Sequence, residues 1–341
     1  MNKPFPFFKC GFVIAMAAVL WIGVTWFIDN RVGGFNSDGV IRVYPHSTPE
    51  DVIAQVQEQL SPKSMCSVER VFRKEKLSRR MTPGLYRFKT TDPPVYLARA
   101  LTYGWQSPVD FTLAGPLRNV ETVASKLSRQ LMIDSTTLVN ALKNTSLLKK
   151  YGTDAEHVFE FLIPDTYQVY WSAPAEDILA KFKEGYDAFW NEERMSAAKT
   201  LGLTPAQVSV LASIVAEESN RADEYPKIAS VYLTRLRKGM KLQACPTVCY
   251  IYGYTINRVL YKHTLNPSPY NTYMYKGLPP APICIPEKTH LEAVLHPAST
   301  PYLYFCASAD LSGRNVFSVT YSEHLNKARA YRAALNNRRK K

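Results

Sequence analysis

The longest apolar stretch of the chain lies close to its N-terminus, where residues 11–28 carry no charged side chain. About 18 such residues are enough to cross the hydrocarbon core of a bilayer. A cleaved signal peptide is the alternative, but Trp26, Phe27 and Ile28 stand where a cleavage site requires small residues. The pattern therefore predicts an uncleaved transmembrane helix over residues 11–28.

The charges on either side of this span predict its orientation. Lys3 and Lys9 precede the span, whereas Arg31, offset by Asp29, follows it. Positively charged flanks are retained on the cytoplasmic side of a membrane. We therefore predict a single-pass protein of the cytoplasmic (inner) membrane, with residues 1–10 in the cytoplasm and the bulk of the chain outside, in the periplasm.

The pattern after the span predicts a small α+β module over residues 40–105, preceded by a linker. Residues 29–39 are rich in Gly, Asn and Ser, a composition typical of linkers. Thr48 and Pro49 favour a helix start, and the following apolar positions share one helical face. The other expected elements are strands over residues 40–44 and 84–89 and a helix over residues 94–101.

Residues 106–200 predict a second small module and a helical connector. The expected elements are a strand over residues 109–113 and helical stretches over residues 120–131, 134–150 and 176–200. Pro164 should interrupt any regular element in the segment between the last two helical stretches. Neither of the two modules contains a recognisable catalytic set of residues, so we place the chemistry in residues 201–338.

A helix that starts at Thr204-Pro205 carries the most informative acidic residues. At 100° per residue, Glu218 continues the apolar stripe of this helix, whereas Glu217 points away from it. A carboxyl group held against apolar side chains favours its protonated form, as a general acid near neutral pH requires. The alternative is that Glu218 is the polar end of an amphipathic helix, paired with Arg221 or Arg235.

Composition narrows the class of protein without deciding it. The formal charge of +13 attracts acidic partners, and 21 tyrosines offer faces on which flat ligands can stack. Lys and Arg form no clustered stripe apart from residues 338–341, so we expect no nucleic-acid partner. The histidines and the Cys245–Cys249 pair lack metal-ligand spacing, so we expect no metal or cofactor and interpret these cysteines as buried small hydrophobes. Disulfide pairing stays open.

Ordered sequence blocks in the last region resemble the endolytic murein transglycosylases, the MltG or YceG-like family. The blocks are ASIVAEE at 212–218, IASVYLTRL at 228–236, LQACPTV at 242–248, YNTY at 270–273, GLPP at 277–280, HP at 296–297, YLYF at 302–305, FS at 317–318 and EH at 323–324, together with FLIPDTY at 161–167. Any one block alone is a weak signal, but their order over most of the exported chain is specific.

The resemblance implies a YceG-like catalytic domain over residues 201–338, with Glu218 as the catalytic residue, and a LysM-like glycan-binding module over residues 40–105. It implies that a single carboxyl group cleaves peptidoglycan strands between N-acetylmuramic acid and N-acetylglucosamine, leaves 1,6-anhydro ends and terminates strand elongation. Cell-wall synthases (penicillin-binding proteins) are the implied partners. The expected substrate-binding residues are Gln243, Thr247, Tyr270, Asn271, Thr272, Tyr273 and Tyr304, as hydrogen-bonding groups or stacking faces.

Three positions depart from the family pattern. Ala216 replaces a frequent glutamate, Cys245 replaces the usual aspartate, and Asn315 replaces a frequent histidine. The first two substitutions reduce the acidic character around the expected site. They support the alternative function, a membrane-anchored glycan-binding scaffold for cell-wall synthases with weakened or lost catalysis.

Overall fold

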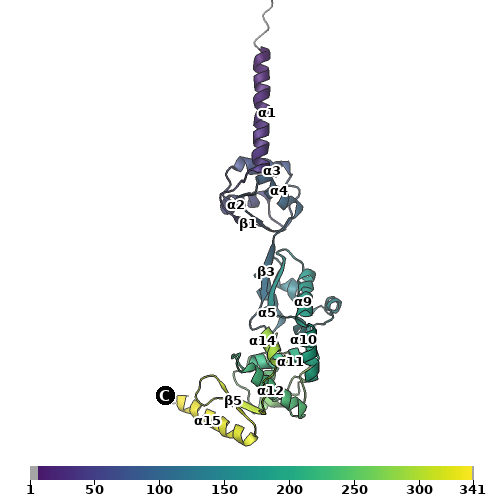
Figure 1. The fold of residues 1–341 in the computed structure, drawn as a ribbon, viewed down its shortest axis with the longest axis vertical. Coiled ribbons are helices and arrows are strands. Elements are labelled where there is room, and N and C mark those ends of the chain that lie inside the picture. The colour runs from purple at the N-terminus through teal and green to yellow at the C-terminus, as the bar shows by residue number, and fades with distance from the viewer. Residues whose placement is uncertain (1–6, 340–341) are drawn as a thin grey trace, which may run out of the picture. The chain divides into compact units, whose positions relative to one another are not determined.

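A computed structural model describes residues 7–339, and Figure 1 shows its helices and strands. Residues 1–6 of the expected cytoplasmic segment and residues 340–341 of the basic tail lie outside this range. The described residues divide into two compact units, the first comprising residues 7–110, 130–132 and 168–174, and the second comprising residues 111–129, 133–167 and 175–339.

The first unit contains the apolar helix and the small α+β module. Its elements are α1 (Phe7–Arg31), β1 (Gly39–Val43), α2 (Pro49–Leu60), α3 (Met65–Lys74), β2 (Gly84–Phe88) and α4 (Pro94–Tyr103). Strands β1 and β2 pair antiparallel, with Gly39 opposite Phe88. Thr48 caps α2 in a capping box with Asp51, as the start signal predicts, and the helical stripe of α2 is buried at Val52 and Val56.

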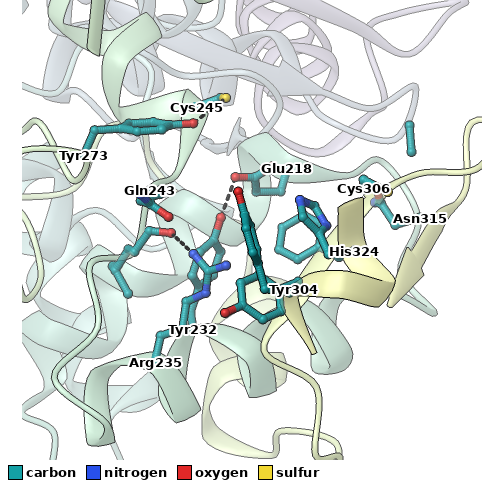
Figure 2. Close-up of a pocket in the computed structure, with 14 residues that line it drawn as sticks. Glu218, Tyr232, Arg235, Gln243, Cys245, Tyr273, Tyr304, Cys306, Asn315 and His324 are labelled. Carbon is teal, nitrogen blue, oxygen red and sulfur yellow. Dashed lines mark hydrogen bonds between the residues drawn. The ribbon is translucent and has the colours of Figure 1, made fainter. Parts of the chain in front are cut away.

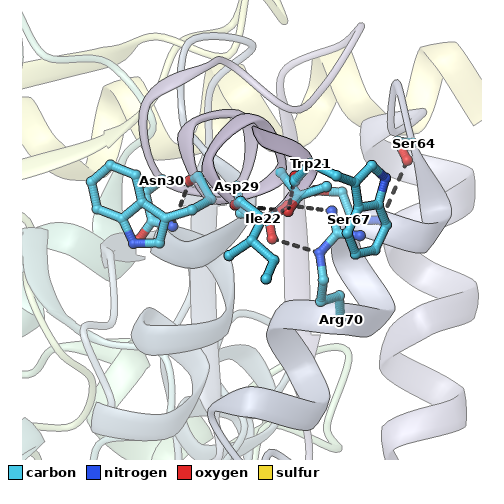
Figure 3. A network of polar contacts seen from close by, with 9 residues as sticks. Trp21, Ile22, Asp29, Asn30, Ser64, Ser67 and Arg70 are labelled. Carbon is cyan, nitrogen blue, oxygen red and sulfur yellow. Dashed lines mark hydrogen bonds and ion pairs between the residues drawn. The ribbon is translucent and has the colours of Figure 1, made fainter. Parts of the chain in front are cut away.

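Helix α1 continues beyond the predicted end of the span and is fixed to the module by a polar network (Figure 3). Its residues Phe12–Arg31 are long and apolar enough to cross a membrane. Asp29, near its C-terminal end, accepts two hydrogen bonds from the Arg70 guanidinium at 2.7 Å and one from the Ser67 hydroxyl. Both partners lie on α3, a helix that the sequence pattern does not predict.

The expected linker over residues 29–39 differs from the structure, because these residues pack into the module. Phe35 is fully buried in the module core, and its ring lies 6.5 Å from that of Phe88. A side chain on Gly33 would collide with the backbone of Thr90. Glycine is required here for close packing of two backbones, and it does not make this segment a flexible spacer.

The second unit contains all described helices from α5 onward, strands β5 and β6, and parts of β3 and β4. Strands β3 (Pro108–Leu113) and β4 (Asp165–Tyr170) pair with each other. The remaining elements are α5 (Val120–Ser128), α6 (Ser135–Lys143), α7 (Thr145–Leu148), η1 (Lys149–Tyr151), α8 (Val158–Phe161), α9 (Ala175–Phe189), α10 (Glu192–Leu201), α11 (Pro205–Glu218), α12 (Tyr225–Arg237), α13 (Cys245–Ile251), η2 (Tyr261–Leu265), α14 (Lys288–Leu295), β5 (Tyr304–Ala307), β6 (Asn315–Ser318) and α15 (Tyr321–Arg339).

Two of the predicted long helices are interrupted by capping asparagines. Asn144 accepts a hydrogen bond from the backbone of Leu147 and starts α7, and Asn191 accepts one from Arg194 and starts α10. Asparagine side chains compete for backbone donors in this way, so they favour helix starts over helix interiors. The apolar periodicity continues across both breaks, which is why the pattern alone predicts single helices.

A large core cluster of the second unit is built around α11. Val208, Leu211, Ile214 and Val215 are fully buried, as predicted, but α11 is surrounded by other helices and its small residues are buried too. Ile163, Phe189 and Trp190 belong to the same core cluster. The end of the predicted helical connector, at Phe189 and Trp190, therefore packs into the same core as α11.

Candidate active site

Glu218 is the last residue of α11, where the helix leaves the core. The N-terminus of α11 is closed by a capping box between Thr204 and Gln207. At the other end, the hydroxyl of Ser219 donates to buried Glu224, which also accepts hydrogen bonds from the backbone and side chain of Asn315. These contacts tie the end of α11 to β6 and fix the backbone beside Glu218.

The carboxyl group of Glu218 is held in place by a buried tyrosine of α12. The hydroxyl of Tyr232 donates to Oε1 of Glu218 at 2.5 Å, as Figure 2 shows. Burial raises the pKa of Glu218 to about 7, because desolvation disfavours the carboxylate more than the Tyr232 hydrogen bond and the charge of Arg235 favour it. A substantial fraction of Glu218 is therefore protonated near neutral pH.

Arg235, one turn after Tyr232 on α12, places a buried positive charge near this carboxyl group. Its guanidinium donates to the backbone oxygens of Leu303 and Leu242, both at 2.7 Å, and lies over the ring of Tyr304 at 5.1 Å. In the described chain, neither of the two predicted arginines forms an ion pair with Glu218. Like Arg235, Arg221 donates to a backbone oxygen instead, that of Ser312. Arg235 instead stabilises the Glu218 carboxylate through space.

The adjacent Glu217 has a different partner. Its two carboxylate oxygens accept hydrogen bonds from Arg118 at 2.8 and 2.7 Å, a bidentate ion pair between residues 99 positions apart. The carboxylate of Glu217 is largely shielded, with 13% of its side chain exposed. Glu217 thus points away from Glu218, as the helical phase predicts, but toward an arginine of the same unit and not into water.

A cavity of about 420 Å³ opens beside Glu218 (Figure 2). Elements from α11 to α15 contribute to its wall, which is formed by Glu218, Tyr232, Arg235, Leu242, Gln243, Cys245, Tyr273, Tyr304, Phe305, Cys306, Ala307, Asn315, Tyr321 and His324. All of these residues lie in the described part of the chain, and Glu218 is the one Asp or Glu among them. The cavity therefore combines one carboxyl group with aromatic rings and neutral hydrogen-bonding groups.

Three of the predicted substrate-binding residues line this cavity, namely Gln243, Tyr273 and Tyr304. Gln243 adopts a left-handed backbone conformation with φ of 51°, and its N–H donates to the oxygen of Thr272 at 3.1 Å. This conformation is strained for a residue with a side chain, and such strain concentrates at functional sites. The hydroxyl of Tyr273 contacts Sγ of Cys245 at 3.1 Å.

The other four predicted residues do not line this cavity. Thr247, Asn271 and Thr272 are almost completely buried, and their side chains bond to the protein. Thr272 accepts from the backbone of Ala244, and Asn271 accepts from the backbone of Tyr273. These residues shape the loops that carry Gln243 and Tyr273. Tyr270 lines a second cavity of the same unit.

Sequence reasoning did not identify several residues of the wall as functional, and His324 on α15 is the most informative of them. Its ring stacks on Tyr304 with 5.4 Å between centroids, and its Nδ1 is shielded without a hydrogen-bond partner in the described chain. Burial, together with the charges of Arg235 and Arg332, lowers the pKa of His324 below its usual range. The EH block at 323–324 is the signal that could have identified it.

The interpretation of Cys245 and Cys249 as buried small hydrophobes is wrong for Cys245, and Cys249 is only half-buried; Cys284 is the buried cysteine among the described residues. Cys245 is exposed at the N-terminus of α13 and lines the Glu218 cavity. Cys66, Cys249 and Cys306 are exposed or half-buried, and all five of these thiols are free in the structure. Cys245 is exposed because it precedes Pro246 in the first turn of α13, where its side chain points out of the core.

Comparison with known proteins adds to this geometry. The YceG-like family matches residues 41–330, which include Glu218 and all the residues that line its cavity. The chain belongs to the YceG-like family. Its relatives include the endolytic murein transglycosylase of Bacillus subtilis (strain 168), 36% identical over 224 residues, which cover 61% of this chain and 59% of that protein.

A second YceG-like relative is the endolytic murein transglycosylase of Streptococcus pneumoniae serotype 2, 26% identical over 48% of this chain and 30% of that protein. The chain thus spans less than two thirds of the length of these curated relatives. A crystal structure of a YceG-like protein from Listeria monocytogenes aligns with a TM-score of 0.56 and 22% identity. It covers 85% of this chain and 98% of that one, which establishes the mixed α+β YceG-like fold.

Proposed function

We propose that this YceG-like chain is an endolytic murein transglycosylase, a lyase that cleaves peptidoglycan glycan strands. The observation that carries the proposal is the half-buried carboxyl group of Glu218, whose pKa is raised to about 7 at the wall of a cavity with no second Asp or Glu among its described residues. The names of its relatives in Bacillus and Streptococcus support the same activity.

In the first step, protonated Glu218 donates its proton to the glycosidic oxygen between N-acetylmuramic acid and N-acetylglucosamine. The bond from C1 of the muramic residue to that oxygen breaks, and the N-acetylglucosamine leaves with the proton. A general acid of this kind contributes about 10²- to 10⁴-fold to the rate. Tyr232 and Arg235 then stabilise the new Glu218 carboxylate by a hydrogen bond and by charge.

In the second step, the C6 hydroxyl of the same muramic residue attacks C1 and closes a 1,6-anhydro ring. The Glu218 carboxylate accepts the hydroxyl proton and so returns to its starting state. Glycosidases that use water need two carboxyl groups in most families, one of which activates the water or attacks the sugar. A cavity with one carboxyl group fits intramolecular attack better, since no activated water is required.

The neutral groups of the cavity would bind the sugars. The Gln243 amide can exchange hydrogen bonds with an acetamido group, and the rings of Tyr273 and Tyr304 can pack on pyranose faces. His324, stacked on Tyr304, would hold that ring at the cavity wall. Thr247, Asn271 and Thr272 would act indirectly, because they hold the loops that present these groups.

The first unit suits an enzyme that works close to the membrane. We propose that α1 anchors the chain with the N-terminus in the cytoplasm, and that the small module is LysM-like and binds glycan strands. Its fixed attachment to α1 through Asp29 and Arg70 supports a module held at the membrane surface. Nascent strands emerge there, so cleavage beside cell-wall synthases would terminate their elongation.

The decisive experiment incubates the full-length protein in lipid nanodiscs with uncrosslinked glycan strands and identifies the new ends by mass spectrometry. We expect 1,6-anhydro-N-acetylmuramic ends from the wild type and none from Glu218→Gln. Reducing N-acetylmuramic ends would show a hydrolase with a second acid outside the cavity. Strand binding without any cleavage would favour the alternative, a glycan-binding scaffold for synthases.

A further inference from the structure

The second unit holds another cavity, of about 490 Å³, which the proposed catalytic steps do not use. It is walled by residues of α5, α6, α8, α13 and nearby loops, namely Arg118, Asn119, Val120, Glu121, Lys143, Ala155, Glu156, Val158, Phe159, Tyr250, Ile251, Gly253, Tyr254, Tyr270 and Pro282. It shares no residue with the wall of the Glu218 cavity. Its wall contains three tyrosine rings, and its two cationic side chains, Arg118 and Lys143, form ion pairs.

The three tyrosines form a continuous aromatic surface. The ring of Tyr250 lies 4.7 Å from that of Tyr270 and 6.3 Å from that of Tyr254. All three rings are half-buried, so each keeps part of its surface toward the cavity. Half-exposed tyrosine faces beside polar groups suit a ligand with flat apolar faces and hydroxyl edges.

The cations of this cavity already have partners. Arg118 holds Glu217 in the bidentate pair and lies 4.4 Å above the ring of Tyr254, while Lys143 pairs with Glu121 at 2.6 Å. A ligand with a carboxylate would compete with Glu217 and Glu121 for these cations and would be repelled by Glu121 and Glu156 in the same wall. A neutral ligand leaves both ion pairs intact, which favours an uncharged sugar over a peptide stem or a muramic residue with its acidic side chain.

The two cavities are connected through shared structural elements. Helix α13 contributes Cys245, at its first residue, to the Glu218 cavity and Ile251, at its last, to the second cavity. Residues 270–273 do the same, since Tyr273 lines the first cavity and Tyr270 the second. Seven helical residues span about 10 Å, so one glycan strand is long enough to occupy both cavities.

We propose that the second cavity is a remote subsite that binds an uncharged N-acetylglucosamine ring of the same strand whose cleaved bond lies at Glu218. The proposal rests on the proposed function and deepens it. Contacts far from the reacting bond supply binding energy that can hold the strand in position for cleavage. Strands long enough to reach this cavity are then bound and cleaved better than short ones.

The test measures both binding and cleavage with peptide-free glycan strands, a tetrasaccharide and a long strand, using the full-length protein in nanodiscs. Ala155→Trp fills the cavity without removing a core side chain, and Tyr250→Leu removes one aromatic face. Tyr261→Leu is the matched control, because Tyr261 is 80% exposed and lines neither cavity. Binding is measured by calorimetry in a Glu218→Gln background, in which strands stay intact.

Each cavity variant should weaken long-strand binding by about three- to tenfold, the loss expected for one aromatic contact, and should lower kcat/KM on long strands by the same factor. Tetrasaccharide binding should not change, and the Tyr261→Leu control should behave like its parent. If Tyr250→Leu fails to fold, Ala155→Trp decides alone. Unchanged long-strand binding by folded Ala155→Trp overturns the subsite, even if wild-type cleavage proceeds. Length-dependent binding in a protein that never cleaves supports the subsite while refuting the proposed function.

Discussion

The hydrogen bond from Tyr232 to Glu218 gives a prediction that tests the acid directly. The substitution Tyr232→Phe keeps the buried ring and its edge-to-face contact with Phe305 at 5.9 Å but removes the hydroxyl. Burial, which raises the pKa of Glu218, is unchanged, whereas the hydrogen bond that lowers this pKa is lost. The pKa of Glu218 should therefore rise above its value of about 7.

The size of this rise follows from the strength of the bond. A hydrogen bond to a charged group contributes about 1.5–3 kcal/mol, and one pKa unit corresponds to about 1.4 kcal/mol. The pKa of Glu218 should thus increase by about one to two units in Tyr232→Phe. Because the protonated carboxyl group starts the reaction, the variant should remain active at higher pH than the wild type.

The assay is a profile of kcat/KM against pH, with release of 1,6-anhydro ends as the signal. The wild-type profile should fall as pH rises through about 7, and the falling limb of Tyr232→Phe should lie about one to two units higher. A loss of activity by the same factor at every pH would mean that Tyr232 only supports packing. A falling limb at the wild-type position, or at lower pH, would refute this account of the Glu218 pKa.

Four further predictions concern Glu218 and its neighbour Glu217, Cys245 and Asp29. Glu218→Gln should lower cleavage by at least about 10²- to 10⁴-fold in anhydro-end release, whereas Glu217→Gln should cost less than about tenfold. In urea titrations, the unfolding free energy of the wild type should fall by at most about 3 kcal/mol between pH 4.5 and 7, because the unfolded chain releases the Glu218 proton at lower pH than the folded chain. Glu218→Gln should flatten this fall. Cys245→Asp should fold and keep a kcat/KM within about tenfold of the wild type or above it, because an acid suits a helix N-terminus and Cys245 is free and exposed. A larger loss in kcat/KM would contradict this prediction. Asp29→Ala leaves the Arg70 charge unpaired and should destabilise the first unit by about 1–3 kcal/mol. The assay is limited proteolysis, which should cleave the variant after residue 31 faster than the wild type. Unchanged proteolysis would mean that this network does not hold the module to α1.

The sequence by itself determined the features that arise within one or two turns of chain. The apolar span, the capped start of α11 at Thr204 and the phase that separates Glu218 from Glu217 all depend on neighbouring residues, so their patterns are readable. The order of short blocks likewise pointed to the YceG-like family before any contact was known. The position of the acid was thus predicted, although its environment was not.

Only the tertiary structure decided what surrounds that acid. Tyr232 and Arg235 reach the Glu218 cavity from α12 and His324 reaches it from α15, while Arg118 meets Glu217 across 99 residues. Burial of Thr247 and the packing of Phe35 into the module were equally invisible in the pattern. The physical reason is that such contacts depend on how distant elements pack, and packing between distant segments leaves no periodic signal in the sequence of either one.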